Sequence, residues 1–269
     1  LPFTPGKDAA GIVHSIGSDV KNVAVGDRVY IFGAITGSYA EYTLCSEENV
    51  FYLPDKVSFK KGACLGTPAF TAYRALFDKA RGRPGDLVFV HGATGGVGLM
   101  AVQMARASGM RVVGTAGSED GIEALLTAGA EAVYNHSDKS YVADIKTTYP
   151  NGFDICLEML ASSNLGIDLP LMAPKGRVAV IGSRGLVEIN PRDLMSKELE
   201  VHGVALLQST AADLKRAGSY INACLEQGTL DPQVSLLLPL EKANEAHVEV
   251  ITRSKVRVGN IVLVPSLST

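Results

Sequence analysis

The sequence lacks both a long hydrophobic run and a strong net charge, and each absence argues against one class of partner. No apolar stretch approaches the length of about 20 residues that a membrane-spanning helix needs. The formal net charge is −3 over 269 residues, and no basic stripe follows the chain, so RNA is only a secondary possibility. These absences predict a small molecule as the partner and no membrane.

Cysteine and histidine are few and widely spaced. The four cysteines form no C-x-x-C pair, which argues against a disulfide framework or a zinc knuckle and predicts a cytoplasmic location. The five histidines match no metal-ligand spacing, and neither G-x-S-x-G nor H-E-x-x-H occurs. Because no nucleophile or metal motif is recognisable, we expect a bound redox cofactor to supply the chemistry.

The beginning of the chain carries no initiator Met: Leu1-Pro2-Phe3 leads at once into a predicted strand. We therefore expect an N-terminal piece of the natural protein to be absent. The rest has ordinary globular composition, 46% hydrophobic and 20% charged, and its length allows two domains.

A β-rich pattern marks the first predicted domain, residues 1–64 together with 234–269. The first part reads as short strands separated by turns, without a helical period of useful length. The last part returns to strand character and is expected to rejoin it. This barrel-like domain would hold strands at residues 10–17, 23–31, 38–44, 49–53, 234–239 and 259–264, with a short helix at 240–251.

Residues 65–233, the second predicted domain, alternate between short apolar runs and segments of helical period. Six strands separated mostly by crossover helices predict an α/β fold with a doubly wound parallel sheet of the Rossmann type. The strands are expected at residues 87–90, 111–115, 132–134, 153–157, 177–181 and 199–206. The helices are expected at residues 71–77, 97–108, 119–128, 141–148, 165–171 and 211–227.

The segment LVFVHGATGGVG, residues 87–98, combines a buried strand, a tight turn and the start of a helix. This order gathers free backbone N–H groups and the positive end of a helix at one point, which suits a pyrophosphate. The spacing is A-x-G-x-x-G, with Ala93 in the first position of the dinucleotide fingerprint. A purely structural turn is the alternative, but the flanking strand and helix favour a nucleotide site.

The end of the second strand of this region carries no carboxylate. In NAD-specific folds an acidic residue about twenty positions beyond the glycine turn binds the ribose 2′-hydroxyl, and here Ala116 holds that place. Because a missing carboxylate admits a 2′-phosphate, NADP is favoured over NAD. Glu119 and Asp120 are close in the sequence, and no nearby Arg or Lys could pair with the 2′-phosphate. His136 or Lys255 would therefore have to supply a polar or cationic contact to that phosphate.

Three further polar residues follow predicted strands: Ser118, Asn164 and Arg184. The carboxyl ends of the strands are where ligands bind in open α/β folds, so each is a candidate for contacting a cofactor. Two have a plain alternative, since Asn164 would also suit a helix N-cap and Arg184 would also suit a solvated loop.

Several motifs occur together along nearly the whole chain, and with them it resembles the zeta-crystallin-type quinone oxidoreductases of the medium-chain dehydrogenase/reductase superfamily. They include GDRV at residues 26–29, YAEY at 39–42, FTAYRAL at 70–76, HGATGGVG at 91–98, GTAG at 114–117, EMLA at 158–161, GSRG at 182–185 and INPRD at 189–193. The resemblance implies a Rossmann domain beside a smaller GroES-like catalytic domain whose first strands would precede Leu1. It also implies a homo-oligomer, dimer or tetramer, paired through residues 199–206.

The resemblance further implies residue roles, with the pyrophosphate held by the glycine turn and the nicotinamide end by the later loops. Gly117 and His136 would contact the adenosine and 2′-phosphate end. The complete predicted cofactor set is Thr94, Gly95, Gly96, Val97, Gly117, Ser118, His136, Asn164, Ile181, Gly182, Ser183, Arg184, Val204, Ala205, Leu206 and Lys255.

The resemblance also implies an enzyme without zinc. Zinc alcohol dehydrogenases of the superfamily carry Gly-His-Glu where this chain has Gly6-Lys7-Asp8, and a ligand Cys where it has Thr67. The expected activity is NADPH-dependent reduction of quinones, with one-electron transfer giving semiquinones. An NADPH-dependent enone or alkenal reductase is the alternative enzyme, and a crystallin or RNA-binding role is the non-catalytic alternative.

Overall fold

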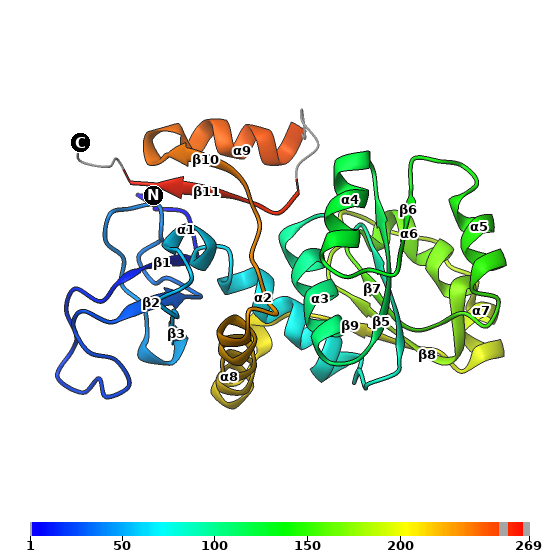
Figure 1. The fold of residues 1–269 in the computed structure, drawn as a ribbon, viewed down its shortest axis with the longest axis horizontal. Helices are drawn as coiled ribbons and strands as arrows, with labels where there is room; N and C mark the ends of the chain where they lie inside the picture. Colours follow the sequence, from blue (N-terminus) through cyan, green and yellow to red (C-terminus); the bar gives the residue numbers. More distant parts are fainter. Residues whose placement is uncertain (1, 253–257, 266–269) are drawn as a thin grey trace. The chain divides into compact units, whose positions relative to one another are not determined.

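The computed structural model describes residues 2–252 and 258–265. The chain forms two compact units (Figure 1), one of Leu1–Phe70 with Gln208–Thr269 and the other of Thr71–Leu207. Among the described residues, no helix combines the length and the apolar character needed to cross a membrane.

The unit of residues 71–207 is built on one sheet of six parallel strands in the order β6-β5-β4-β7-β8-β9. The strands are β4 (Leu87–His91), β5 (Arg111–Ala116), β6 (Ala132–Asn135), β7 (Phe153–Glu158), β8 (Met172–Val180) and β9 (Glu200–Gly203). Because β4 and β7 are adjacent and the chain winds outward from each, the order is that of a doubly wound Rossmann sheet. The predicted α/β fold is confirmed.

Continuous apolar runs explain why β4 and β7 lie at the centre. Val88, Phe89 and Val90 are 0% exposed, as are Ile155 and Leu157, since a parallel sheet is buried on both faces. Helices pack on these strands: α3 against β4 and β5, α4 against β5 and β6, and α6 against β7. The helices of this unit are α3 (Gly96–Ala107), α4 (Glu119–Thr127), α5 (Tyr141–Thr148), α6 (Ala161–Asp168) and α7 (Pro191–Lys197).

Element boundaries in this unit differ from the prediction where local chemistry intervenes. The helix expected at 165–171 begins at Ala161 and gives way after Asp168 to a 3₁₀ turn, Leu169–Leu171, in which Pro170 has no N–H to donate. The strand expected at 199–206 ends at Gly203. The helix predicted at 71–77 lies within α2 (Gly66–Tyr73) and the π-helical continuation Arg74–Lys79.

The other unit contains two separate sheets within the described residues, rather than the predicted barrel-like arrangement. One is antiparallel, β1 (Ala9–Ile12), β2 (Arg28–Ile31) and β3 (Val50–Tyr52), and the other is the parallel pair β10 (Val234–Pro239) and β11 (Asn260–Val264). The strand predicted at residues 38–44 is wrong: residues 38–42 form bends and residues 43 and 44 are irregular. Gly37 has a φ of +83°, and the Ser38 and Tyr39 N–H groups turn to the carbonyls of Gly6 and Pro5.

The C-terminal part lies in the same compact unit as residues 1–70. Asn260 Nδ2 donates to the Cys64 carbonyl at 3.2 Å, and His247 of α9 (Ala243–Thr252) lies 3.2 Å from the Tyr39 hydroxyl. The edges of the two units, however, differ from the expected domain boundaries at 64/65 and 233/234. Residues 208–233 belong to the β-rich unit because α8 (Ala211–Gln227) packs there, with the Tyr30 hydroxyl donating to Asn222 at 3.0 Å.

Candidate functional site

The predicted cofactor residues follow the carboxyl ends of all six parallel strands. Since parallel strands end at the same edge of a sheet, the topology gathers these residues at one edge, the usual ligand-binding edge of an open α/β sheet. Residues 94–97 follow β4, 117 and 118 follow β5, 136 follows β6, 164 follows β7, 181–184 follow β8, and 204–206 follow β9. Lys255 lies outside the described residues.

The turn between β4 and α3 leaves room for a ligand on one side and is closed on the other. A side chain at Gly95, the N-cap residue of α3, would meet no atom within 4 Å. A Cβ at Gly98 would lie 2.4 Å from the Ala93 carbonyl oxygen, so only glycine lets the helix approach the turn this closely. The first turn of α3 contains no acidic residue. The arrangement therefore presents backbone N–H groups and a positive helix end to an anion.

The end of β5 is apolar and lies beside an imidazole. Ala116 is 0% exposed, and a Cβ at Gly117 would lie 2.9 Å from His136 Nε2. His136 is held there because its Nδ1 is 3.3 Å from the Thr115 hydroxyl. The Ser118 hydroxyl accepts from the Gly121 N–H at 3.2 Å, so this candidate caps α4. The edge at β5 thus offers an imidazole and no carboxylate at Ala116.

The loops after β7 and β8 are tied to each other. The Ala161 N–H donates to the Gly182 carbonyl at 2.8 Å, and the Arg184 N–H donates to the Ser162 hydroxyl at 3.2 Å. The N-cap residue of α6 is Leu160, so the alternative that Asn164 is this N-cap is wrong; its amide donates instead to Glu158 Oε1 at 3.1 Å. The Arg184 residue is exposed.

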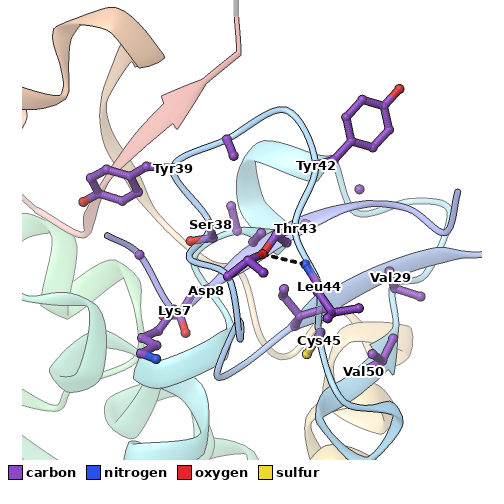
Figure 2. Close-up of a pocket in the computed structure, with 18 of the residues that line it drawn as sticks. Lys7, Asp8, Val29, Ser38, Tyr39, Tyr42, Thr43, Leu44, Cys45 and Val50 are labelled. Carbon is purple, nitrogen blue, oxygen red and sulfur yellow. Dashed lines mark hydrogen bonds between the residues drawn. The ribbon is translucent and has the colours of Figure 1, made fainter. Parts of the chain in front are cut away.

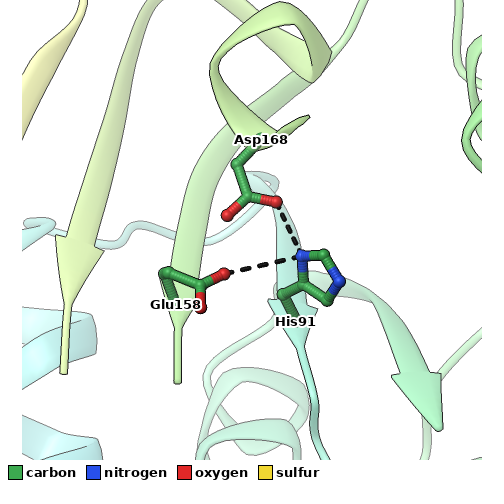
Figure 3. Close-up of side chains that lie close together, drawn as sticks. All are labelled: His91, Glu158 and Asp168. Atoms are coloured by element: carbon green, nitrogen blue, oxygen red, sulfur yellow. Dashed lines mark hydrogen bonds and ion pairs between the residues drawn. The ribbon is translucent and has the colours of Figure 1, made fainter. Parts of the chain in front are cut away.

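Three buried titratable residues lie close together at the same edge, and none was in the predicted site (Figure 3). They are His91 at the end of β4, Glu158 at the end of β7 and Asp168 at the end of α6, with 2%, 0% and 0% exposure. His91 Nδ1 is 2.7 Å from Asp168 Oδ1 and 3.5 Å from Glu158 Oε2. Burial raises the pKa of Glu158 to about 8 and that of Asp168 to about 6, and lowers that of His91.

The spacing within this cluster suits hydrogen bonds better than a metal ion. Donor atoms around tetrahedral zinc lie about 3.4 Å apart, given bonds of about 2.1 Å. The 2.7 Å between His91 Nδ1 and Asp168 Oδ1 is a hydrogen-bond distance instead. A signal for the cluster existed in the sequence, because His91 and Glu158 are polar residues that end two runs of buried strand residues. Their partner Asp168 gave no such signal.

The β-rich unit holds a cavity of about 1410 Å³ (Figure 2), and two residues that replace zinc ligands by resemblance occur there. The Thr67 hydroxyl donates to Asp8 Oδ1 at 2.8 Å, and the Lys7 ammonium donates to the Ala34 carbonyl at 3.3 Å. Burial raises the pKa of Asp8 to about 6. The Thr67 hydroxyl, the Asp8 carboxyl and the Lys7 ammonium group therefore form hydrogen bonds with other groups of the protein.

Two family models match the chain. Residues 1–55 match the alcohol dehydrogenase GroES-like domain, and residues 96–221 match the zinc-binding dehydrogenase family. The quinone oxidoreductase of Rattus norvegicus is 46% identical over 98% of this chain and 80% of that protein. The quinone oxidoreductase of Homo sapiens is 46% identical over 93% of this chain and 77% of that protein.

Solved structures agree with this likeness. The structure of Escherichia coli quinone oxidoreductase complexed with NADPH superposes with a TM-score of 0.86 at 28% identity, covering 98% of this chain and 83% of that one. The identity to the mammalian proteins, the extent of the match and the order of the sheet agree with one another. The chain belongs to the quinone oxidoreductase family of the medium-chain dehydrogenase/reductase superfamily.

Proposed function

We propose that this oxidoreductase reduces quinones with NADPH bound at the carboxyl edge of its parallel sheet. The observation that supports NADPH as the cofactor is the end of β5, where a fully buried Ala116 stands in place of a carboxylate and the His136 ring occupies the space that a side chain at residue 117 would need. The NADPH complex of the Escherichia coli relative supports it. When bound, NADPH would supply the electrons for the reduction.

The residues of this edge fit the dinucleotide part by part. The open space at Gly95 and the N–H groups of residues 94–97 suit the pyrophosphate, while Gly117 and His136 suit the 2′-phosphate end. The loops 181–184 and 204–206, with Asn164, would orient the nicotinamide, and positioning against a flat apolar substrate is their main task. Ser118 and Lys255 complete the proposed set, which needs no zinc.

Replacing Ala116 by Asp tests the cofactor assignment. A carboxylate at this position would repel the 2′-phosphate and accept from a 2′-hydroxyl, so A116D should bind NADPH at least about tenfold more weakly and NADH more tightly, given about 1.4 kcal/mol per tenfold change. Titration calorimetry with both nucleotides measures this, with Ala116→Ser as the uncharged control. Equal affinities of the unaltered protein for NADPH and NADH would refute the 2′-phosphate assignment.

Quinone as the substrate rests on the family and needs its own experiment. Turnover of simple ortho- and para-quinones with NADPH should exceed turnover of an enone or alkenal of similar size. If only the enone is reduced, the chain is an alkene reductase.

One-electron transfer is tested by electron paramagnetic resonance during turnover, where a semiquinone signal is expected.

The remaining proposals concern the oligomeric state and the location: the chain pairs with a second copy and is found in the reducing cytoplasm. The edge position of β9 supports pairing through residues 199–206, because an unpaired edge strand can continue its sheet in a second copy. Analytical ultracentrifugation should give a dimer or tetramer. Four free cysteines support the location. RNA stays a secondary possibility, tested by salt-dependent retention on single-stranded RNA.

A further inference from the structure

One residue, Glu158, anchors the start of both loops that follow β7 and β8. Its Oε1 accepts from the Leu160 backbone N–H and, at 3.1 Å, from Asn164 Nδ2. Its own backbone carbonyl accepts from the Ile181 N–H at 2.9 Å. The carboxyl therefore holds the loop after β7 directly, and the Ala161–Gly182 hydrogen bond ties that loop to the loop after β8. Asn164 and residues 181–184 of these loops belong to the proposed cofactor set.

The second oxygen of the Glu158 carboxyl, Oε2, faces titratable side chains that come from several elements. They are His91 of β4, Asp168 of α6, Cys156 of β7, Tyr141 of α5, whose hydroxyl is 3.4 Å from His91 Nε2, and His136 after β6, whose ring centroid is 6.4 Å from that of His91. Within the described part of the chain, neither Glu158 nor Asp168 pairs with a Lys or Arg. Glu158 Oε2 and Asp168 Oδ2 are buried and accept no hydrogen bond from the described residues.

A single distribution of protons gives each of these buried groups a partner. In this distribution a neutral Glu158 carboxyl would donate to an ionised Asp168, which lies within reach of a side-chain hydrogen bond, and Asp168 Oδ1 would accept from His91 Nδ1–H. His91 Nε2 then accepts from the Tyr141 hydroxyl. Only one negative charge stays buried. With a pKa of about 8 for Glu158 and about 6 for Asp168, this distribution is the one expected at neutral pH.

We propose that Glu158 is a positioning residue whose neutral carboxyl, hydrogen-bonded to Asp168, holds the loops after β7 and β8 in the form that binds NADPH. The inference rests on the proposed NADPH site and adds to it a residue that acts through Asn164 and the Ile181–Arg184 segment. When Glu158 loses its proton at alkaline pH, two buried carboxylates face each other and repel. The loops then shift and the affinity for NADPH falls.

Dissociation constants for NADPH, measured by calorimetry from about pH 6.5 to about pH 9.5, test this. The unaltered protein should lose about tenfold in affinity over about one pH unit above pH 8, as expected when one ionisation opposes binding. Glu158→Gln keeps a donor and an acceptor but cannot ionise, so it should bind normally at pH 7 and show no alkaline loss. Glu158→Leu should bind weakly throughout. Glu131→Gln, the same change in an exposed pair with Arg111, should follow the unaltered protein.

Nitrogen-15 spectra of the unliganded protein give a readout that does not need NADPH. The amide signals of Leu160, Ala161 and Gly182 should titrate near pH 8 in the unaltered protein and not in E158Q, and His91 should carry its proton on Nδ1. An alkaline loss of affinity in E158Q, an Nε2–H tautomer, or a stoichiometric divalent metal ion in the purified protein would overturn the inference. If the amides titrate as expected but NADPH does not bind, the proposed function fails and the proton arrangement stands.

Discussion

The two edges of the parallel sheet treat their acidic side chains differently. Where the strands begin, acids pair with arginines in contact with solvent: Glu131 with Arg111 and Glu200 with Arg81. Where the strands end, Glu158 and Asp168 are fully buried and meet His91 and each other. The first kind of pair is screened by water and contributes little. The contribution of the buried cluster depends on which members carry protons. Removing one member leaves buried polar groups without a hydrogen-bond partner.

Removing Asp168 should have the largest effect and tests this contrast directly. In Asp168→Ala the buried His91 N–H and the Glu158 O–H lose their acceptor, which should destabilise the protein by about 2–5 kcal/mol. Glu131→Gln weakens the exposed pair with Arg111 at the opposite edge and should leave the unfolding midpoint unchanged. Thermal unfolding of both variants measures the difference. Similar midpoints for the two variants would show that the edges do not differ in this way.

Two glycine substitutions in the turn after β4 should have different effects, one on the stability of the fold and the other on the affinity for NADPH. Gly98→Ala forces a Cβ against the Ala93 backbone and should cost about 1–3 kcal/mol of stability, as overpacking does. Gly95→Ala meets no protein atom, so its stability should be unchanged while NADPH binds about tenfold more weakly, a loss of about 1.4 kcal/mol. Unfolding midpoints and calorimetry measure the two effects. A stable G98A, or a G95A that binds NADPH normally, would contradict the proposed geometry of the turn.

The buried cluster should also make the stability of the protein depend on pH. The pKa of Glu158 is raised from 4.5 to about 8 on folding, so the folded state keeps a proton that the unfolded state releases. Its stabilising effect is complete below pH 4.5 and is lost as pH rises to about 8. Asp168 acts in the same direction at lower pH, up to about 6. E158Q should therefore become more stable relative to the unaltered protein between pH 6 and 8, and a constant difference would argue against a neutral Glu158.

Local patterns were sufficient to predict the parallel sheet and the edge at which the candidate cofactor residues gather. The mainly apolar runs that end at Val90 and Leu157 predicted strands, and the glycine turn after the first of them requires close approach of a helix. The bends at residues 38–42 were missed because Ala40, Tyr42 and Leu44 alternate with polar residues as in a strand, although Gly37 adopts a positive φ. The cluster around Glu158 was missed because its members are 67 and 10 residues apart along the chain.

The sequence by itself determined the order of elements, the glycine turn and the absence of a carboxylate at Ala116, because each depends on residues that are neighbours along the chain. The tertiary structure decided which distant groups share a buried space. His91 and Asp168 are 77 positions apart and meet at 2.7 Å only because β4 and β7 pair and α6 packs on β7. Burial then sets their protonation, since the cost of an unsolvated charge depends on surroundings that no local pattern describes.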